Sequence, residues 1–307
     1  MIKRLFLFIL CCLILTGCAA PAAADAEGYT FTDDLGRTVT IQNSQRTAAL
    51  LGSFAQIWQL AGGQVCATAD DAWEDLQLDL PENTVNIGNT KDASLELLFS
   101  AAPDLILASS QTRQHRDWQE TLEATGIPVA YFNVSDFEDY LRLLKLCTDL
   151  TSREDLYRKN GLAVKEQIEA VLEQSQKRGT TPTVLSMRAS ASLITVKNSK
   201  DNVLGEMLKA LGCVNIADSE DSLLENISIE IILEADPDYI FIVQRGDNAE
   251  GMKAYVENMM QENPAWLELT AVQQDRLYFM DKNLYNLKPN HRWGEAYEKL
   301  EEILENG

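Results

Sequence analysis

Histidine and catalytic motifs are scarce in this chain. Its 307 residues include only two histidines, His115 and His291, so a catalytic triad or a metal site built from several imidazoles is hard to assemble. The sequence has no G-x-S-x-G, H-E-x-x-H or G-x-x-x-x-G-K-[ST] motif and no glycine fingerprint for a dinucleotide. These absences argue against a hydrolase or another secreted enzyme, and we expect no catalytic activity.

Positive charge is also in short supply. Lysine and arginine number 26 against 47 aspartates and glutamates, which gives a formal net charge of −21. A surface this acidic repels nucleic acid and anionic lipid head groups, so we expect no nucleic-acid partner. Such acidity is typical of a well-hydrated soluble surface. It does not exclude an anionic small ligand, because a few arginines gathered at one place reverse the local field.

The cysteines that follow the leader do not form a disulfide or metal-binding framework. Cys66, Cys147 and Cys213 lie in apolar contexts, they are odd in number, and no two of them have C-x-x-C spacing. This arrangement supports neither a zinc site nor a set of disulfides. We expect buried free thiols at these positions.

Long apolar runs are missing except at the N-terminus. Lys3 and Arg4 precede Leu5–Leu15, a run too short to span a bilayer as a permanent helix. The run ends in Leu-Thr-Gly-Cys at residues 15–18, which resembles the lipobox of bacterial lipoproteins. An ordinary secretory signal with a chance cysteine is the alternative.

The lipobox resemblance implies a signal peptide over residues 1–17, cleaved before Cys18, and acylation of that cysteine. Residues 18–28 are rich in alanine and unpatterned, as expected for a lipid-anchored linker. Cleavage removes Lys3 and Arg4 and leaves the mature chain more acidic. We therefore expect an extracytoplasmic domain, lipid-anchored to the outer face of the cell membrane.

Beyond the leader, strand and helix patterns alternate. Tyr29–Ile41 favours a β-hairpin around an Asp-Asp-Leu-Gly turn at residues 33–36. Short apolar strands then alternate with helical segments, which favours parallel sheets covered by helices on both faces. The expected strands are Thr47–Leu51, Val65–Thr68, Leu105–Ala108, Pro128–Phe132, Thr183–Met187, Tyr239–Val243 and Leu277–Met280.

One segment interrupts the alternation. Arg153–Arg178 has no proline, a single glycine and apolar residues at helical spacing, so it predicts one helix of roughly 39 Å at about 1.5 Å per residue. The sequence thus predicts an α/β fold in which two Rossmann-like lobes are joined by a single long α-helix. The expected boundaries are 29–151 for the N-terminal lobe, 152–179 for the linking helix and 180–307 for the C-terminal lobe.

An internal repeat relates the two lobes. Residues 94–106, Ser-Leu-Glu-Leu-Leu-Phe-Ser-Ala-Ala-Pro-Asp-Leu-Ile, match residues 228–240, Ser-Ile-Glu-Ile-Ile-Leu-Glu-Ala-Asp-Pro-Asp-Tyr-Ile. Such an S-[LI]-E helix before a P-D-[LY]-I strand in both halves resembles the helical-backbone family of periplasmic binding proteins, the iron-siderophore, haem and vitamin B12 binders of ABC importers. The resemblance extends over residues 29–304, through segments 47–51, 57–62, 86–89 and 204–217.

The resemblance implies a binding function. The ligand would lie in a cleft between the lobes, at the carboxyl ends of the strands, and the stiff linking helix would allow only slight closure. Glu96 and Glu230 match the glutamates with which the family docks on an ABC permease dimer, itself served by a cytoplasmic ATPase. The alternative is that each glutamate only complements the positive end of its helix, worth about 0.3–1 kcal/mol. We expect the protein to be a monomer.

Basic residues follow several of the expected strands, which is notable in so acidic a chain. Arg188 follows Thr183–Met187, where some family members place an arginine against an anionic siderophore, so it is the first candidate. The alternative for each basic residue is an exposed surface charge, and for each aromatic residue a place in the core. The candidate ligand-binding residues are Arg188, Arg113, Arg245, Arg116, Tyr285, Trp73 and Arg292.

The sequence leaves the ligand open, and we expect neither a resident cofactor nor a protein metal site. A ferric siderophore ranks first, haem second because Tyr285, His115 or His291 could bind its iron, and a corrinoid third. A zinc or manganese binder of a related importer is a further alternative, weakened by the scarcity of histidine. A non-transport adhesin or sensor on the same fold is another.

Overall fold

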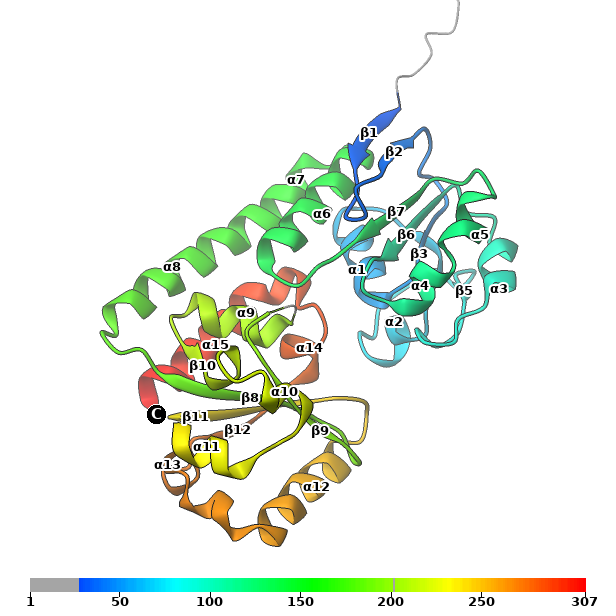
Figure 1. Cartoon of the computed structure of the whole chain (residues 1–307). Coiled ribbons are helices and arrows are strands. Elements are labelled where there is room, and N and C mark those ends of the chain that lie inside the picture. The colour runs from blue at the N-terminus through cyan, green and yellow to red at the C-terminus, as the bar shows by residue number, and fades with distance from the viewer. Residues whose placement is uncertain (1–27, 201) are drawn as a thin grey trace, which may run out of the picture.

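The computed structural model describes residues 28–200 and 202–307 and consists of two α/β lobes connected by a long helix (Figure 1). The predicted fold class is confirmed. The predicted signal peptide, Cys18 and nearly all of the predicted linker lie outside the described residues.

The N-terminal lobe is built on a parallel sheet with strand order β5-β4-β3-β6-β7. Its strands are β3 (Thr47–Ala49), β4 (Val65–Thr68), β5 (Val85–Asn86), β6 (Leu105–Ser109) and β7 (Val129–Phe132). Its helices are α1 (Gly52–Leu60), α2 (Asp71–Glu74), α3 (Leu95–Ser100), α4 (Arg113–Asp117), α5 (Gln119–Glu123) and α6 (Phe137–Leu150). The predicted hairpin, β1 (Tyr29–Thr32) and β2 (Thr38–Ile41), precedes the sheet.

The C-terminal lobe repeats this design. Strands β10-β8-β11-β12 are parallel, and β9 pairs antiparallel with β8. The strands are β8 (Thr183–Ala189), β9 (Ile194–Lys197), β10 (Val214–Asn215), β11 (Tyr239–Gln244) and β12 (Leu277–Met280). The helices are α9 (Val203–Ala210), α10 (Ser222–Glu225), α11 (Ile229–Ala235), α12 (Ala249–Glu262), α13 (Thr270–Gln273), α14 (Lys282–Tyr285) and α15 (Trp293–Asn306), with 3-10 turns at Ile216–Asp218, Pro264–Glu268 and Asn290–Arg292.

The linking helix is continuous but not uniform. It runs as α7 (Glu154–Tyr157), a π-helical turn (Arg158–Leu162) and α8 (Ala163–Lys177). The π turn is held against the N-terminal lobe by Asn160, whose side-chain amide donates to the Leu60 carbonyl at 2.8 Å. The hydroxyl of Tyr140 in turn donates to the Asn160 carbonyl at 2.8 Å. The turn therefore fastens the start of the linking helix to α1 and α6, a detail that helical spacing alone did not predict.

A second connection between the lobes runs through the core. One buried hydrophobic cluster extends from Leu144 of α6 to Phe241 of β11 and contains Trp293 at the start of α15. Trp293 is fully buried and meets Phe137 edge-on, with ring centroids 6.3 Å apart. Just before it, the Asn290 amide donates to the Ser53 carbonyl at 3.0 Å, so the C-terminal segment contacts α1 directly.

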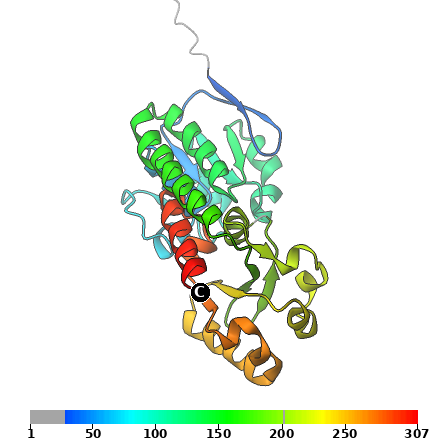
Figure 2. The same cartoon turned by 90° about the vertical axis from the view of Figure 1, so that its left-hand side faces the viewer.

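Helix α15 also returns along the linking helix. The two lie side by side, α15 in red and α8 in green (Figure 2). The buried side chains of Arg178, at the end of α8, and Glu301, on α15, form an ion pair, and the Gln167 amide donates to Glu298 at 2.7 Å. The lobes are thus joined along two parallel helices as well as through the shared core, which limits how far they can move apart.

The thiols of Cys66, Cys147 and Cys213 are free. Cys147 and Cys213 are buried as predicted, and burial raises the pKa of the Cys213 thiol to about 12. Cys66, on β4, is only half-buried. Its thiol contacts the Arg46 carbonyl at 3.4 Å. Across the described part of the chain, the helices are all too short or too polar to cross a membrane.

We predict that Trp293→Ala lowers the free energy of unfolding by about 3–5 kcal/mol, because it opens a cavity in the core that both lobes share. Calorimetry should show one unfolding transition for the wild type and two for this variant. The control is Trp266→Ala, since Trp266 is equally buried but belongs to a core cluster confined to the C-terminal lobe. A Trp293→Ala protein that unfolds in one unshifted transition would contradict the shared core.

Candidate functional site

Two arginines lie on one face of the C-terminal sheet, at its carboxyl end. Strand β8 runs two residues further than the sequence predicted, so Arg188 is inside the strand and pairs with Val243 of β11. Side chains alternate between faces along a strand, which puts Arg245, two residues after Val243, on the face of Arg188. The Arg245 amide still donates to the Ala189 carbonyl at 2.7 Å, so the register continues to this point. Burial, and then the charge of Arg245, lower the pKa of Arg188.

Two lysines lie near these arginines: Lys197, which the sequence analysis missed, and Lys288, which follows the expected strand Leu277–Met280. Lys197 ends β9, and burial followed by the charges of Arg188 and Arg245 lowers its pKa. Lys288 follows α14, and burial is the main cause of its lowered pKa, with the charge of Arg188 adding to it. Alternation in Ile-Thr-Val-Lys at residues 194–197 was a signal for the strand. For Lys288 the signal was its place after the last expected strand, and the segment after α14 brings it to the N-terminal lobe.

The N-terminal lobe presents carboxylates at the same junction. Asp71 of α2 accepts a hydrogen bond from the Gly52 amide at 2.9 Å, at the first turn of α1. Burial raises the pKa of Asp71 to about 6, although the nearby Lys288 charge acts in the opposite direction. The junction therefore sets a basic C-terminal side against an acidic N-terminal side.

An ion-pair bridge crosses this junction. The ammonium of Lys282, at the start of α14, lies 2.6 Å from a carboxylate oxygen of Asp75 in the N-terminal lobe. The same ammonium pairs with Asp247, which lies between β11 and α12 in the C-terminal lobe. Lys282 thus connects carboxylates of both lobes and keeps them close together despite their like charge.

The other candidates predicted from the sequence have different surroundings. The side chain of Arg113 is 90% exposed and pairs with Asp117 at 3.6 Å. Arg116 donates to the Ser110 carbonyl at 3.1 Å, and Arg292 donates to Glu295 at 2.7 Å. These guanidiniums already have partners within the chain, and no contact between any of them and Arg188 is recorded among the described residues.

The two aromatic candidates, Tyr285 and Trp73, differ in their exposure to solvent. Tyr285 is buried and its hydroxyl donates to the Ala296 carbonyl at 3.1 Å. Packing around α14 and α15 encloses the Tyr285 ring, so the structure does not place it at an open surface. Trp73 in α2 remains partly exposed, two residues from Asp71 at the junction.

The histidines are poorly placed for binding a metal together. His115 is buried, its Nδ1 accepts a hydrogen bond from the Ser109 amide at 3.1 Å, and burial lowers its pKa to about 4. His291 is exposed in the turn before α15. Within residues 28–200 and 202–307, no three histidine, cysteine or carboxylate side chains gather in a group that could hold a metal ion.

The two repeated glutamates occupy equivalent, exposed positions. Glu96 is in the first turn of α3 and Glu230 in the first turn of α11, one in each lobe (Figure 1). Serines cap both helices: the Ser94 hydroxyl accepts from the Leu97 amide at 3.2 Å and that of Ser228 from the Ile231 amide at 3.4 Å. The Ser228 hydroxyl also donates to the Glu230 carboxylate at 2.9 Å, and both glutamates are exposed to solvent.

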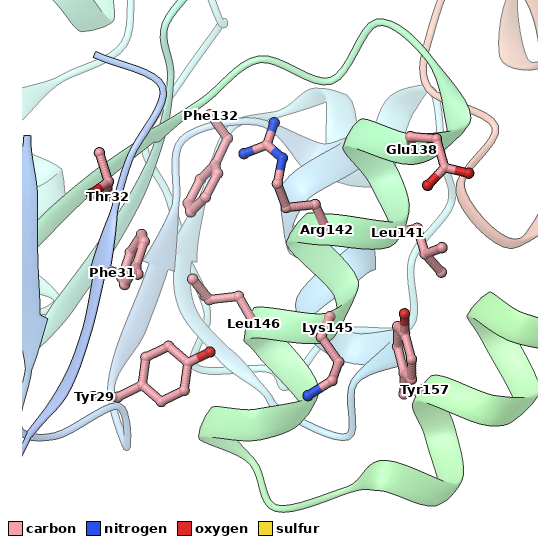
Figure 3. A pocket seen from close by; sticks show the side chains of 10 residues that line it. All are labelled: Tyr29, Phe31, Thr32, Phe132, Glu138, Leu141, Arg142, Lys145, Leu146 and Tyr157. Atoms are coloured by element: carbon pink, nitrogen blue, oxygen red, sulfur yellow. The ribbon is translucent and has the colours of Figure 1, made fainter. Parts of the chain in front are cut away.

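A cavity of about 350 Å³ lies elsewhere, between β1 and α6 (Figure 3). Its cations are already paired within the chain, Arg142 with Asp34 at 2.7 Å and Lys145 with Asp149 at 2.5 Å. It therefore lacks the free positive charge found at the junction. The residues that line it are Tyr29, Phe31, Thr32, Phe132, Glu138, Leu141, Arg142, Lys145, Leu146 and Tyr157.

Comparison with known proteins identifies the family. The family described as periplasmic binding protein matches residues 48–284. The Fe(3+)-citrate-binding protein YfmC of Bacillus subtilis is 23% identical over 297 residues, which cover 93% of this chain and 90% of that protein.

Solved structures agree in fold. An ABC transporter substrate-binding protein from Listeria monocytogenes has a TM-score of 0.72 at 19% identity, covering 86% of this chain and all of that one. SirA of Staphylococcus aureus, complexed with staphyloferrin B, has a TM-score of 0.69 at 19% identity, covering 90% and 98%. Haem-binding and vitamin B12-binding proteins also match. The family inferred from the repeated helix and strand is confirmed, and the chain belongs to the periplasmic binding protein family.

Proposed function

We propose that this chain is the substrate-binding lipoprotein of an ABC importer, and that it captures a ferric siderophore outside the cell. It delivers the complex to a permease dimer that a cytoplasmic ATPase drives. The protein acts as a monomer tethered by Cys18 and catalyses no reaction. Its family membership, and the importer named for the Listeria structure, support the importer role.

The observation that carries the proposal is the pair of serine-capped helices α3 and α11. Each exposes one glutamate, Glu96 or Glu230, at the same position in its lobe. A two-fold permease needs two carboxylates held at a fixed separation, one for each half. The shared core and the doubled helix connection keep the lobes, and hence these two carboxylates, at nearly constant distance.

A ferric siderophore suits the junction better than haem. Arg188 and Arg245 offer guanidiniums to an anionic chelate, and charge-assisted hydrogen bonds of this kind are among the strongest in proteins. Haem iron would need an axial ligand, but Tyr285 and His115 are buried and already hydrogen-bonded. His291 is exposed before α15, and the charges that act on it are those of Arg292, Glu295 and Lys159 and not those of the junction arginines. The names of the relatives that bind Fe(3+)-citrate and staphyloferrin B favour the same class.

The proposed docking of Glu96 and Glu230 on the permease predicts that reversing both charges blocks uptake. We expect Glu96→Arg with Glu230→Arg to abolish uptake of the ferric chelate by whole cells, because both carboxylates that meet the permease become cations. Ligand affinity measured by titration should stay unchanged. The matched control is Glu120→Arg with Glu257→Arg, which reverses two other exposed glutamates, one in each lobe. Normal uptake by the Glu96/Glu230 variant would show that the docking assignment is wrong.

Anchoring predicts a change in location. Cys18→Ala should release or mis-process the protein without unfolding the domain, because it removes the acylated sulfur. Fractionation of cells followed by detergent partition measures the outcome. Cys11→Ala, which changes a cysteine inside the apolar leader, should leave the protein on the membrane. A Cys18→Ala product that stays fully membrane-bound is incompatible with the lipobox.

The proposed contact between Arg188 and the ligand predicts that removing this guanidinium lowers the affinity. In a thermal-shift panel of ferric citrate, a ferric tris-catecholate, haemin and a corrinoid, one ferric chelate should raise the melting temperature. Arg188→Ala should weaken binding of that chelate by about 10- to 100-fold, since a charge-assisted contact is worth roughly 1.5–3 kcal/mol. Arg113→Ala, in which the exposed guanidinium is already paired, is the control. Equal affinity of both variants and wild type would remove Arg188 from the site.

A further inference from the structure

The face of the C-terminal sheet that carries Arg188 holds a third cation in register. In the antiparallel pair β8–β9, Arg188 lies opposite Thr195 and Ser186 lies opposite Lys197. Ser186 and Arg188 are two residues apart and share a face, and so do Thr195 and Lys197. The pairing therefore places Lys197 on the face of Arg188 and Arg245, independently of any electrostatic argument.

Lys288 completes the group from the opposite side. Its ammonium lies 5.8 Å from the centre of the Phe54 ring, which belongs to α1 of the N-terminal lobe. Burial lowers the pKa of Lys288, the charge of Asp71 in the N-terminal lobe acts in the opposite direction, and the charge of Arg188 lowers the pKa further. Lys288 thus lies against a phenyl ring of the N-terminal lobe and within reach of the charges of Asp71 and Arg188.

These four cations are not neutralised by the chain. In the part of the chain that the structure describes, none of Arg188, Lys197, Arg245 and Lys288 has a recorded ion pair, whereas buried Arg178 and half-buried Lys282 pair with Glu301 and Asp75. Arg188, Lys197 and Lys288 are partly buried and Arg245 is exposed. Like charges held close together at partial burial disfavour one another. A protein with a net charge of −21 has ample carboxylates with which to pair them. Unpaired cations in such a chain point to an anion that comes from outside.

The chemistry at this group favours carboxylate over catecholate. Guanidiniums form two-pronged hydrogen bonds with free carboxylates, and lysines add compact charges. Catecholates and tetrapyrroles present flat aromatic surfaces that are usually bound by stacking. Here the Phe54 ring is covered by Lys288 and the Tyr285 ring is enclosed in the core. Trp73 is partly exposed, but it belongs to α2 on the acidic N-terminal side of the junction.

We propose that Lys197 and Lys288, with Arg188 and Arg245, form a four-cation site for a ferric polycarboxylate chelate, whose carboxylates contact these side chains while no side chain binds the iron. The proposal rests on the importer function proposed above and specifies its ligand class. It predicts recognition by charge, so affinity should fall as ionic strength rises.

The test titrates the mature protein with ferric citrate, a ferric tris-catecholate and haemin. Wild type should bind ferric citrate most tightly. Lys197→Gln and Lys288→Gln should each weaken that binding by about tenfold or more and reduce its salt dependence. Without ligand, both variants should melt at the wild-type temperature or above, because each relieves repulsion between like charges; a merely structural lysine would lower it.

Two lysines serve as controls. Lys200→Gln removes an exposed lysine near β9, and Lys253→Gln removes a lysine that, like Lys288, lies over a phenylalanine ring, that of Phe279 at 5.5 Å. Both should leave binding unchanged. Wild-type affinity for ferric citrate in Lys197→Gln and Lys288→Gln, or tighter binding of the catecholate, would overturn the four-cation site alone. Tightest binding of haemin would overturn the siderophore function as well. Binding of none of the ferric chelates would overturn the siderophore function with it.

Discussion

The hydrophobic core shared between the lobes is the constraint on which the rest of the molecule depends. Trp293 packs against Phe137 while Asn290 bonds to α1, so the C-terminal segment belongs to both lobes. The π turn at Asn160 fixes the linking helix from the other end. Lobes connected in this way are restricted in their relative motion, which suits the proposed docking, since Glu96 and Glu230 would have to keep their separation.

The same crossing segment organises the charges at the junction. It brings Lys282 between Asp75 and Asp247, and it carries Lys288 to a place between Phe54 and Arg188. Carboxylates of the N-terminal lobe are thus held near cations of the C-terminal lobe without cancelling all of them. The uncancelled cations lie at the carboxyl end of a parallel sheet, where open α/β folds bind ligands. Packing and recognition therefore depend on one stretch of chain.

Much of the fold was predictable because local sequence patterns determine where its strands and helices lie. Val65–Thr68 and Leu277–Met280 were located to the residue, since short apolar runs between turn signals leave little freedom. The repeat also located Glu96 and Glu230, because a serine cap and a Pro-Asp break fix a helix from both ends. Arg188 and Arg245 were found because each follows an apolar run that reads as a strand.

The rest depends on contacts that no local pattern records. Strand β9 pairs with β8, and this pairing determines that Lys197 lies on the same face of the sheet as Arg188. Tyr285 looked accessible after a strand, yet packing of α14 against α15 buried it. The π turn arises because the Asn160 amide reaches Leu60, a hundred positions earlier in the chain. Partners this distant are set by the packing of whole elements, which sequence spacing does not encode.

The most direct test of a ligand held by charge between the lobes is the position of its metal. Crystals of the mature protein grown with ferric citrate would give an anomalous scattering peak from iron. The account predicts a peak between Arg188 and Asp71, with chelate oxygens within hydrogen-bond distance of the Arg188 and Arg245 guanidiniums and no side chain coordinating the metal. Iron located beside Tyr29 and Lys145, or coordinated by a histidine, tyrosine or carboxylate of the chain, would contradict it.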